Sequence, residues 1–429
     1  MSKKTQRILL VTAAFLVLVM ALVLIYEFAY ARGRRKKTLP KLPGWVDASM
    51  TYDPDLLSPG LLKIMEKKLY QPLALEGDKE GLFLVSFYET AKKPGGEGSH
   101  SNLYLASDQI MLGRGLARMG RRSDFLRWAQ DFDKLFKDGE RGFHLAYLEE
   151  REGSLQGQEA HWSLTLAFTR ALLEGYQAFG GQDLALMIQD SSDKLLPLFQ
   201  EGRTASLLQA GPRMLLAYDE WDIPPPGTLP QPGQDKPIEY VRGTHLADVD
   251  LWALMALSRF NPAWAPLASQ WQSILHEARL DSQGPLFASA LEEDGQSYIP
   301  VTGGSLLCQT SEQIRIALYL AEVESLDGTF VSFLRSQLRD DKRLPSGWNP
   351  ATGAPAASLA RSSDYALALS LGRAVQDKVL IDSAREVLMY QYASSQSSDI
   401  FGGWYRPGET DRSYKLLAED NAAVLVALR

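Results

Sequence analysis

Residues 250–257 read Asp-Leu-Trp-Ala-Leu-Met-Ala-Leu, a polar start followed by a run that is apolar on nearly every face of a helix. The same form recurs in three other stretches: Ser-Leu-Thr-Leu-Ala-Phe at 163–168, Glu-Gln-Ile-Arg-Ile-Ala-Leu-Tyr-Leu at 312–320 and Asp-Tyr-Ala-Leu-Ala-Leu at 364–369. A helix without a polar face is stable only when other protein surrounds it. These stretches therefore predict buried helices that begin at polar clusters.

Polar starts of this kind recur along the chain, mostly about 50 to 65 residues apart, at Ser107, Ser163, Asp248, Ser311, Ser363 and Asp420. Amphipathic stretches alternate with them, around Leu61, Phe125, Leu184, Trp264, Phe330 and Ile381. Such recurrence indicates repeated helical hairpins. We expect an all-α fold in which six hairpins close into an (α/α)6 barrel, with the apolar helices inside. A straight solenoid is the alternative, although its repeats are usually shorter, about 20 to 50 residues.

Composition narrows the classes of function. The 429 residues carry a net charge of -7, which argues against a nucleic-acid binder because such proteins present a basic face to the phosphates. A single cysteine, Cys308, excludes an intramolecular disulfide and a cysteine-built metal site, and we expect it to be a small buried residue. The five histidines lack metal-site spacing and no nucleotide-binding motif is present, so we expect no metal and no cofactor.

The N-terminus predicts a membrane segment. Residues 8–26 are uncharged and apolar, follow three basic residues, and are about long enough to cross a bilayer as a helix. Ala29-Tyr30-Ala31 has the form of a signal-peptidase site, so residues 1–31 are a signal peptide or an uncleaved anchor, and the length of the run favours the anchor. The basic flank after the run by itself favours a cytoplasmic barrel. The overall layout is typical of exported chains, and we expect a single-pass membrane protein with an extracellular domain, or a secreted one.

Domain boundaries follow from this layout. Residues 32–56 are basic at their start and contain Pro40 and Pro43, so they predict a linker. Residues 57–429 then form one barrel domain.

Three of the expected inner helices open alike: Ser107-Asp108-Gln109, Ser311-Glu312-Gln313 and Ser362-Ser363-Asp364. One interpretation is helix capping, because serine accepts a backbone N–H and an acid suits the first turn. The other is chemical, since inner helices of an α/α barrel start at one mouth and their acids can face each other there. Glycoside hydrolysis needs such a pair, one carboxylic acid for the leaving oxygen and one carboxylate to activate water.

These segments resemble glycoside hydrolase family 8, the cellulases, chitosanases and xylanases with (α/α)6 barrels. Residues 107–128 are similar to the family's Ser-Glu-Gly-Gln-Gly-Tyr-Gly-Met…Phe…Trp segment, and residues 312–316 to its Asp-Ala-x-Arg-x segment. The resemblance implies that Asp108 is the general acid and that Glu312 is the base that activates water. We also expect Arg315, which falls on the arginine of that segment, and Asp364 to bind substrate.

The chain departs from the family where the chemistry lies. The acid is Asp instead of Glu, the base is Glu instead of Asp, and the family's two substrate-site aspartates are replaced by Ser163 and Thr165. One hypothesis is an inverting glycosidase of the endo-β-glycanase type that cleaves a cellulose-like or other exopolysaccharide. The other is a catalytically inactive barrel that binds glycan or scaffolds a membrane polysaccharide synthase. A polysaccharide lyase is a third.

Sugar sites also need aromatic faces. Candidates near the expected helix starts or in Gly/Pro loops are Trp162, Trp221, Trp348, Trp404 and Tyr405. We expect these rings to stack on pyranose faces, and packing in the core is the alternative for the tryptophans.

Overall fold

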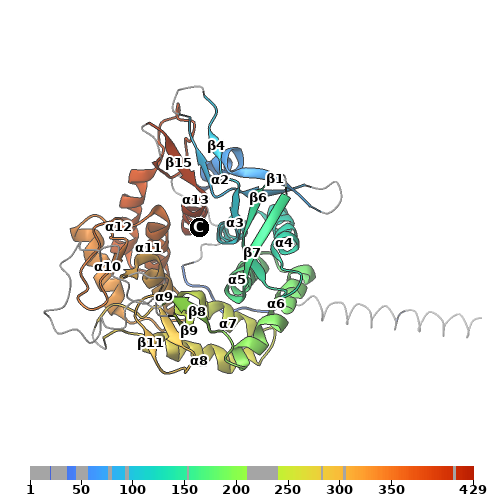
Figure 1. The fold of residues 1–429 in the computed structure, drawn as a ribbon, viewed down its shortest axis with the longest axis vertical. Helices are drawn as coiled ribbons and strands as arrows, with labels where there is room; N and C mark the ends of the chain where they lie inside the picture. The colour runs from blue at the N-terminus through green and yellow to red at the C-terminus, as the bar shows by residue number, and fades with distance from the viewer. Residues whose placement is uncertain are drawn as a thin grey trace, which may run out of the picture.

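A computed structural model describes residues 20, 36–44, 57–75, 80–91, 96–151, 154–209, 240–281, 284–302, 306–408 and 412–429. Within these ranges the chain is mostly helical and its helices form a closed ring (Figure 1). The inner helices are α3 (Ala106–Arg118), α5 (Trp162–Phe179), α7 (Leu251–Leu257), α9 (Thr310–Glu322), α11 (Ser362–Ala374) and α13 (Ala418–Ala427). Each inner helix contacts the next, and α13 returns to pack on α3. This closure confirms the predicted barrel and excludes the straight solenoid.

The outer helices also lie where the sequence predicts them. They are α2 (Leu57–Lys68), α4 (Arg122–Phe136), α6 (Gln182–Gln200), α8 (Trp264–Glu277), α10 (Gly328–Asp340) and α12 (Lys378–Leu388). Their amphipathic sequences explain this position. In α4, for example, Phe125 and Phe132 are fully buried while Arg127 is exposed.

Two glycines let α4 pack tightly between inner helices. A Cβ atom on Gly113 of α3 would lie 2.2 Å from the ring of Trp128, and one on Gly175 of α5 would lie 2.2 Å from the ring of Phe125. Both rings belong to α4. A larger residue at either glycine would therefore push the two helices apart.

The strands are the part of the fold that the all-α prediction got wrong. The described residues contain five small antiparallel sheets, and most of their strands have two to five residues, too short for an alternating pattern to stand out. The strands are β1 (Tyr70–Ala74), β2 (Glu80–Leu84), β3 (Phe87–Glu89), β4 (Ser99–His100), β5 (Leu103–Leu105), β6 (His144–Arg151), β7 (Ser154–His161), β8 (Ser206–Gln209), β9 (Tyr240–His245), β10 (Ala290–Glu292), β11 (Tyr298–Ile299), β12 (Cys308–Gln309), β13 (Gly347–Trp348), β14 (Tyr405–Pro407) and β15 (Tyr414–Leu417). Their orders are β1-β2, β14-β15-β3-β4, β5-β6-β7, β11-β10-β9-β8 and β12-β13.

Several strands lie directly before inner helices. β5 leads into α3, β7 into α5, β12 into α9 and β15 into α13, while β9 leads into the 3-10 turn η2 (Leu246–Asp248) ahead of α7. A second 3-10 turn, η3 (Met389–Gln391), follows α12. We call the end of the barrel at which the inner helices begin the mouth, and the end at which they finish the rear.

Part of the predicted linker packs against the rear of the barrel. The backbone N–H of Lys37 donates to the Tyr176 hydroxyl at 2.8 Å, and the Lys37 ammonium donates to the Arg259 carbonyl at 2.9 Å. Tyr176 lies in the last turn of α5, and Arg259 follows α7, so the ammonium meets the negative end of a helix dipole. Leu42 is 3% exposed. Residues 36–44, which we call the strap, are therefore a docked part of the domain.

Two other predictions concern single segments. Cys308 is fully buried, as predicted. Within the described ranges no helix combines the length and the apolar content needed to cross a bilayer. The predicted membrane run at residues 8–26 lies outside those ranges, apart from Met20.

Candidate active site

Asp108 lies in the first turn of α3, 1% exposed, and does not cap the helix. Its Oδ1 accepts a 3.4 Å hydrogen bond from the Ser107 hydroxyl, while its buried Oδ2 has no hydrogen-bond partner in the part of the chain that the structure describes. Burial raises the pKa of Asp108 well above its usual range, and the negative charges of Glu419 and Asp420 raise it further. These surroundings favour the protonated form of Asp108, and within the described ranges no protein group bonds its Oδ2.

Glu312 occupies the equivalent first turn of α9 in the opposite electrostatic state. Its Oε1 lies 3.2 Å from Nε2 of His245, and its Oε2 accepts a 3.1 Å hydrogen bond from the Ser289 hydroxyl. Burial works to raise the pKa of Glu312, but the hydrogen bond with His245 and the charges of His245 and Arg315 outweigh it and lower the pKa. The surroundings of Glu312 therefore favour its ionised form.

Asp364 follows the capping interpretation. Its Oδ2 accepts a 2.7 Å hydrogen bond from the backbone N–H of Arg361 at the start of α11. Burial raises the pKa of Asp364 to about 6, with the charges of Glu419 and Asp420 adding to the effect. The capping interpretation thus fits one of the three similar helix starts, whereas Asp108 and Glu312 leave their helix ends uncapped by side chains.

The sequence analysis did not place the acids of α13 in the site. Asp420 is buried, accepts a 3.0 Å hydrogen bond from the backbone N–H of Ser363 and pairs with Arg406 at 2.7 Å. Glu419 is half exposed and pairs with Arg361 at 3.1 Å. Asp108, Asp364 and these two acids form one acidic side of the mouth, where the charges of Glu419 and Asp420 add to the effect of burial on the pKa of Asp108 and of Asp364.

A signal for these positions was present in the sequence as an acid followed by an amide. At three inner-helix starts the amide side chain bonds both the N–H and the C=O of one upstream residue: Gln109 with Leu84 (3.0 and 2.7 Å), Gln313 with Phe287 (2.8 and 2.9 Å) and Asn421 with Trp404 (2.8 and 2.9 Å). The amide fixes the helix start against the preceding segment. The acid before it, Asp108, Glu312 or Asp420, is fixed with it.

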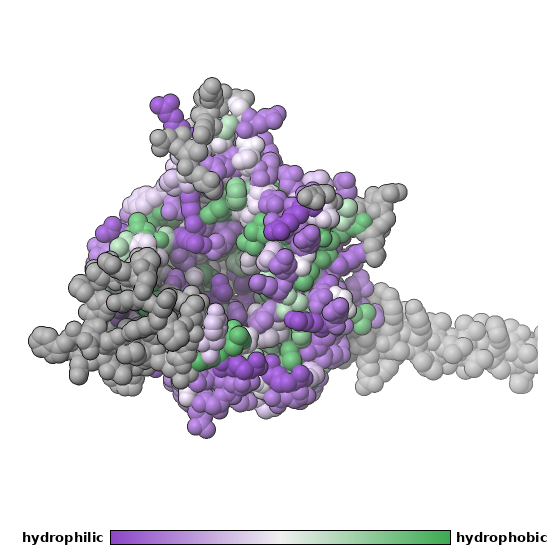
Figure 2. Space-filling view, viewed as in Figure 1, coloured by the Kyte–Doolittle hydropathy of each residue, from purple (hydrophilic) through white to green (hydrophobic). Residues whose placement is uncertain are grey.

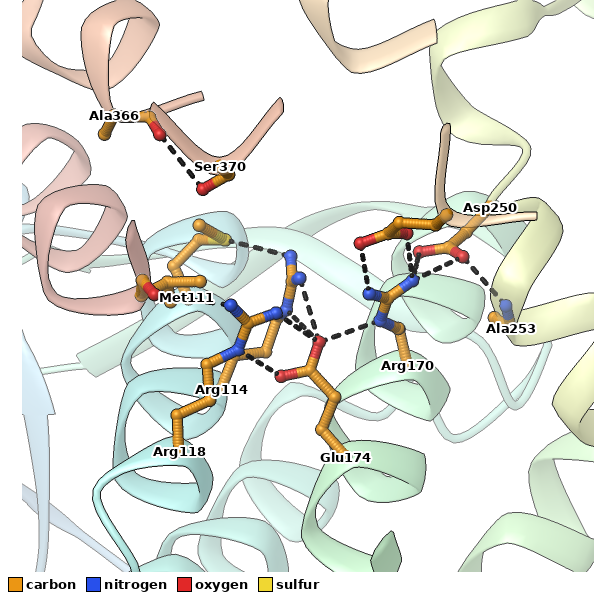
Figure 3. Close-up of polar contacts among 11 residues, drawn as sticks. Met111, Arg114, Arg118, Arg170, Glu174, Asp250, Ala253, Ala366 and Ser370 are labelled. Atoms are coloured by element: carbon orange, nitrogen blue, oxygen red, sulfur yellow. Dashed lines mark hydrogen bonds and ion pairs between the residues drawn. The ribbon is translucent and has the colours of Figure 1, made fainter. Parts of the chain in front are cut away.

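Further along the inner helices lies a network of charged side chains, nearly all of them buried, which is drawn in Figure 3. Glu174 of α5 accepts hydrogen bonds from Arg114, Arg118 and Arg170, at 2.8 to 3.0 Å. Arg170 also pairs with Asp250 at 2.8 Å and with Glu322 at 2.7 Å. The network joins α3, α5, α7 and α9, and every charge in it has a partner.

Three of the predicted aromatic faces are buried in the core. Trp162 is 6% exposed, and Trp348 and Trp404 are 0% exposed. The Trp162 indole N–H donates to the Thr204 carbonyl at 3.0 Å and that of Trp404 to the Leu388 carbonyl at 2.8 Å, so polar groups inside the protein hold these rings. None of the three offers an open face to a sugar in this structure, and core packing, the alternative interpretation, describes them.

The remaining predicted contacts lie in different places. Tyr405 is half-buried, and its ring makes an edge contact, 5.1 Å between centroids, with Tyr414, which is 45% exposed. Arg315 is half-buried on α9, one turn after Glu312. Trp221 falls outside the described residues.

A buried triad explains one departure from the family pattern. Thr165 Oγ1 lies 3.0 Å from Nδ1 of His144, and Nε2 of His144 lies 3.2 Å from Asp133. The groups resemble a nucleophile, base and acid, but Thr165 and His144 are each 1% exposed. Thr165 therefore ties α5 to β6 and α4 instead of facing a substrate.

Across the described ranges no three or more His, Cys, Asp or Glu side chains are grouped so that they could hold an ion. Figure 2 shows a largely hydrophilic face with small separate hydrophobic groups over the described residues.

Comparison with known proteins supports the fold. No protein-family model matches the chain, and no curated protein matches it. An α-amylase from Clostridium perfringens superposes with a TM-score of 0.62 at 15% identity, covering 87% of this chain and 97% of that one. A GH8 protein from Teredinibacter turnerae, in complex with xylobiose, gives 0.55 at 11%, covering 88% and 93%, and a D-mannose isomerase gives 0.53 at 13%, covering 88% and 98%. At these identities the likeness establishes a shared fold alone.

Proposed function

We propose that this protein is a glycoside hydrolase that cleaves a polysaccharide at the mouth of the barrel. The observation that carries the proposal is the contrast between two buried carboxyl groups at equivalent helix starts. Asp108 has surroundings that favour its neutral form, whereas Glu312 meets His245 and Ser289, which favour its ionised form. Environments that push two carboxyl pKa values apart are typical of acid–base pairs in glycosidases. The likeness of the fold to an α-amylase and to a GH8 protein bound to xylobiose agrees with this class of reaction.

The proposed mechanism is a single displacement with inversion. Asp108 gives its proton to the glycosidic oxygen as the bond between that oxygen and the anomeric carbon breaks. Glu312 takes a proton from a water molecule, whose oxygen forms the new bond from the opposite face of the sugar. Each turnover leaves Asp108 ionised and Glu312 protonated, and exchange of one proton with solvent restores both. Inversion requires the two carboxyl groups to stand roughly 6.5–9.5 Å apart around that water.

The proposed substrate is a β-linked polysaccharide, cellulose-like or another exopolysaccharide. This choice rests on the segments that resemble family 8. Because the fold is similar to that of an α-amylase, an α-glucan is the alternative substrate for the same type of reaction. Arg315, one turn beyond Glu312, and Tyr405 are the proposed contacts to the glycan.

A catalytically inactive barrel that binds glycan or scaffolds a polysaccharide synthase is the second candidate. The observation in its favour is the 1% exposure of Asp108, because a general acid must reach the glycosidic oxygen. The core positions of Trp162, Trp348 and Trp404 point the same way, since they remove three proposed sugar platforms.

We further propose that residues 8–26 hold the barrel at the outer face of a cell membrane, with the rear toward the bilayer. The strap begins at Lys36 on the rear, and the ten residues from Tyr26 to Lys36 span at most about 36 Å. To reach the mouth from the rear, the chain would have to cross two helix layers of about 10 Å each and then run the length of an outer helix. An outer helix of 15 residues such as α4 is about 22 Å long, so this path is longer than the ten residues can span. The mouth is therefore free to meet polysaccharide on the side away from the membrane.

The test is a digestion panel with the full chain in detergent, using β-1,4-glucan, xylan, chitosan and an α-glucan, with the anomeric configuration of the first product followed by proton NMR. Hydrolysis of a β-linked polymer with inversion supports the proposal. If only the α-glucan is cleaved, the proposed β-linked substrate is wrong and an α-glucan replaces it. If the product retains its anomeric configuration, the inverting mechanism is overturned. Binding of a polymer without any cleavage supports the inactive barrel.

A further inference from the structure

Two strands bring a histidine and a serine onto Glu312. His245 is the last residue of β9, and Ser289 directly precedes β10, its antiparallel neighbour, so that Ala290 pairs with His245. His245 Nε2 lies 3.2 Å from Oε1 of Glu312, and the Ser289 hydroxyl donates to Oε2 at 3.1 Å. Within the described part of the chain each carboxylate oxygen thus has one protein donor, which leaves it a lone-pair direction for another partner.

The charges around His245 favour its protonated form. Burial by itself lowers the pKa of His245, but the hydrogen bond with Glu312 and the charges of Asp248 and Glu312 outweigh burial and Arg315, and the pKa is raised. His161 interacts electrostatically with His245, and burial together with the charge of His245 lowers the pKa of His161, so the pair favours a proton on His245. The N–H of Ser163 donates to Nδ1 of His161 at 3.3 Å, which leaves the ring proton on Nε2.

We propose that His245 is a positioning residue for the base: with Ser289 it holds both oxygens of Glu312, so that one fixed lone pair faces the attacking water. The inference deepens the proposed function and rests on it for the role of Glu312 as the base. A base that must abstract a proton within one geometry gains from being held, because a small misplacement costs orders of magnitude in rate. No proton leaves His245 in the reaction.

The pairing exists only inside a window of pH. The pKa of Glu312 is lowered, so its charge is lost as the pH falls through that lowered value. The pKa of His245 is raised, so its charge is lost as the pH rises through that raised value. Removing the imidazolium therefore moves the titration of Glu312 toward its ordinary pKa, and the acid limb of the rate profile moves to higher pH.

The experiment compares His245→Gln, His245→Ala and Ser289→Ala with the control His276→Gln, an outer-helix histidine, in the full chain. We expect His245→Ala to lower kcat about tenfold or more with KM within about twofold, and to move the acid limb of kcat to higher pH. His245→Gln, which keeps an N–H without the charge, is expected to restore much of kcat but not the position of the limb. An acid limb that stays in place in both His245 variants would overturn the proposal, because a purely structural loss lowers kcat without moving the limb.

A second readout does not depend on turnover. NMR titration of the imidazole rings is expected to give His245 a pKa above that of a free histidine, and Glu312→Gln is expected to lower it while leaving His276 unchanged. If the pKa of His245 is the same in Glu312→Gln as in the wild type, the proposal is overturned. If the wild-type chain cleaves no glycan, the proposed function fails, and this titration alone decides whether His245 holds Glu312.

Discussion

The inner helices carry ionisable side chains in two places, in the middle of the barrel and at the mouth, and these side chains differ in how many partners they have. In the middle of the barrel, Arg170 is fully buried and meets three acids, Glu174, Asp250 and Glu322, at 2.7 to 2.8 Å. At the mouth, the equally buried Asp108 has, among the residues the structure describes, only a long contact to Ser107 and one oxygen without a partner. Charges in the middle are neutralised by one another and stabilise the fold, whereas the carboxyl at the mouth is held neutral and unengaged. That difference separates structural polar groups from candidate catalytic ones.

The largest effect should come from breaking the buried network. Arg170→Leu leaves Asp250 and Glu322 without their cation, and we expect the free energy of unfolding to fall by about 3–5 kcal/mol in urea titrations. The control is Arg339→Gln, whose pair with Asp340 is about 60% exposed at both ends and should leave the free energy of unfolding almost unchanged. If the free energy of unfolding falls equally in the two variants, the buried network stabilises the fold no more than a surface ion pair does.

Neutralising the mouth acid should act with the opposite sign. The unfolded chain ionises Asp108 above about pH 4 while the folded chain keeps the proton, so stability from this residue is lost as the pH rises. Asp108→Asn is neutral in both states, and we expect it to be more stable than the wild type at pH 7, by a margin that shrinks toward pH 4. Denaturant melts at the two pH values measure this. A variant that is destabilised equally at both would show that Asp108 is ordinary core.

Substitutions of aromatic residues should have smaller effects, and they should distinguish rings that pack in the core from a ring that contacts the glycan. Tyr405→Ala is expected to raise KM for the glycan roughly three- to tenfold with kcat nearly unchanged, because the ring lies beside an exposed tyrosine and contributes on the order of 1 kcal/mol of contact. Trp404→Leu, one residue earlier in the chain, should lower the unfolding free energy instead, since its ring is fully buried. Michaelis kinetics and thermal melts of both variants give the comparison. Loss of stability in Tyr405→Ala with an unchanged KM would remove Tyr405 from the site.

Much of the fold was predictable because helical periodicity is strong over long segments. All six starts and all six outer helices lie close to their predicted places. The strands were not predictable, since most of them are too short to show alternation. The strap at 36–44 was also missed, because its contacts, such as Lys37 with Arg259, join residues far apart in the sequence.

The site was predictable in part for the same reason. The sequence marks Asp108, Glu312 and Asp364 as similar helix starts, but the fold gives them different surroundings. Asp108 is buried without a close partner among the described residues, Glu312 meets His245, and Asp364 accepts from the backbone of Arg361. The repeated acid–amide pair would have added Asp420 to the candidates. Tryptophans in Gly/Pro loops indicated open platforms, yet the loops fold back and bury the rings of Trp348 and Trp404.

The most direct test of the central claim is reducing-end release from the preferred polymer by the full chain and three variants: Asp108→Asn, Glu312→Gln and the control Glu149→Gln, whose partner Arg151 is 59% exposed. The account predicts that each of the first two lowers kcat by about a hundredfold to ten-thousandfold while binding persists and Glu149→Gln matches the wild type. Activity within about tenfold of wild type in either Asp108→Asn or Glu312→Gln would contradict the assignment of acid and base.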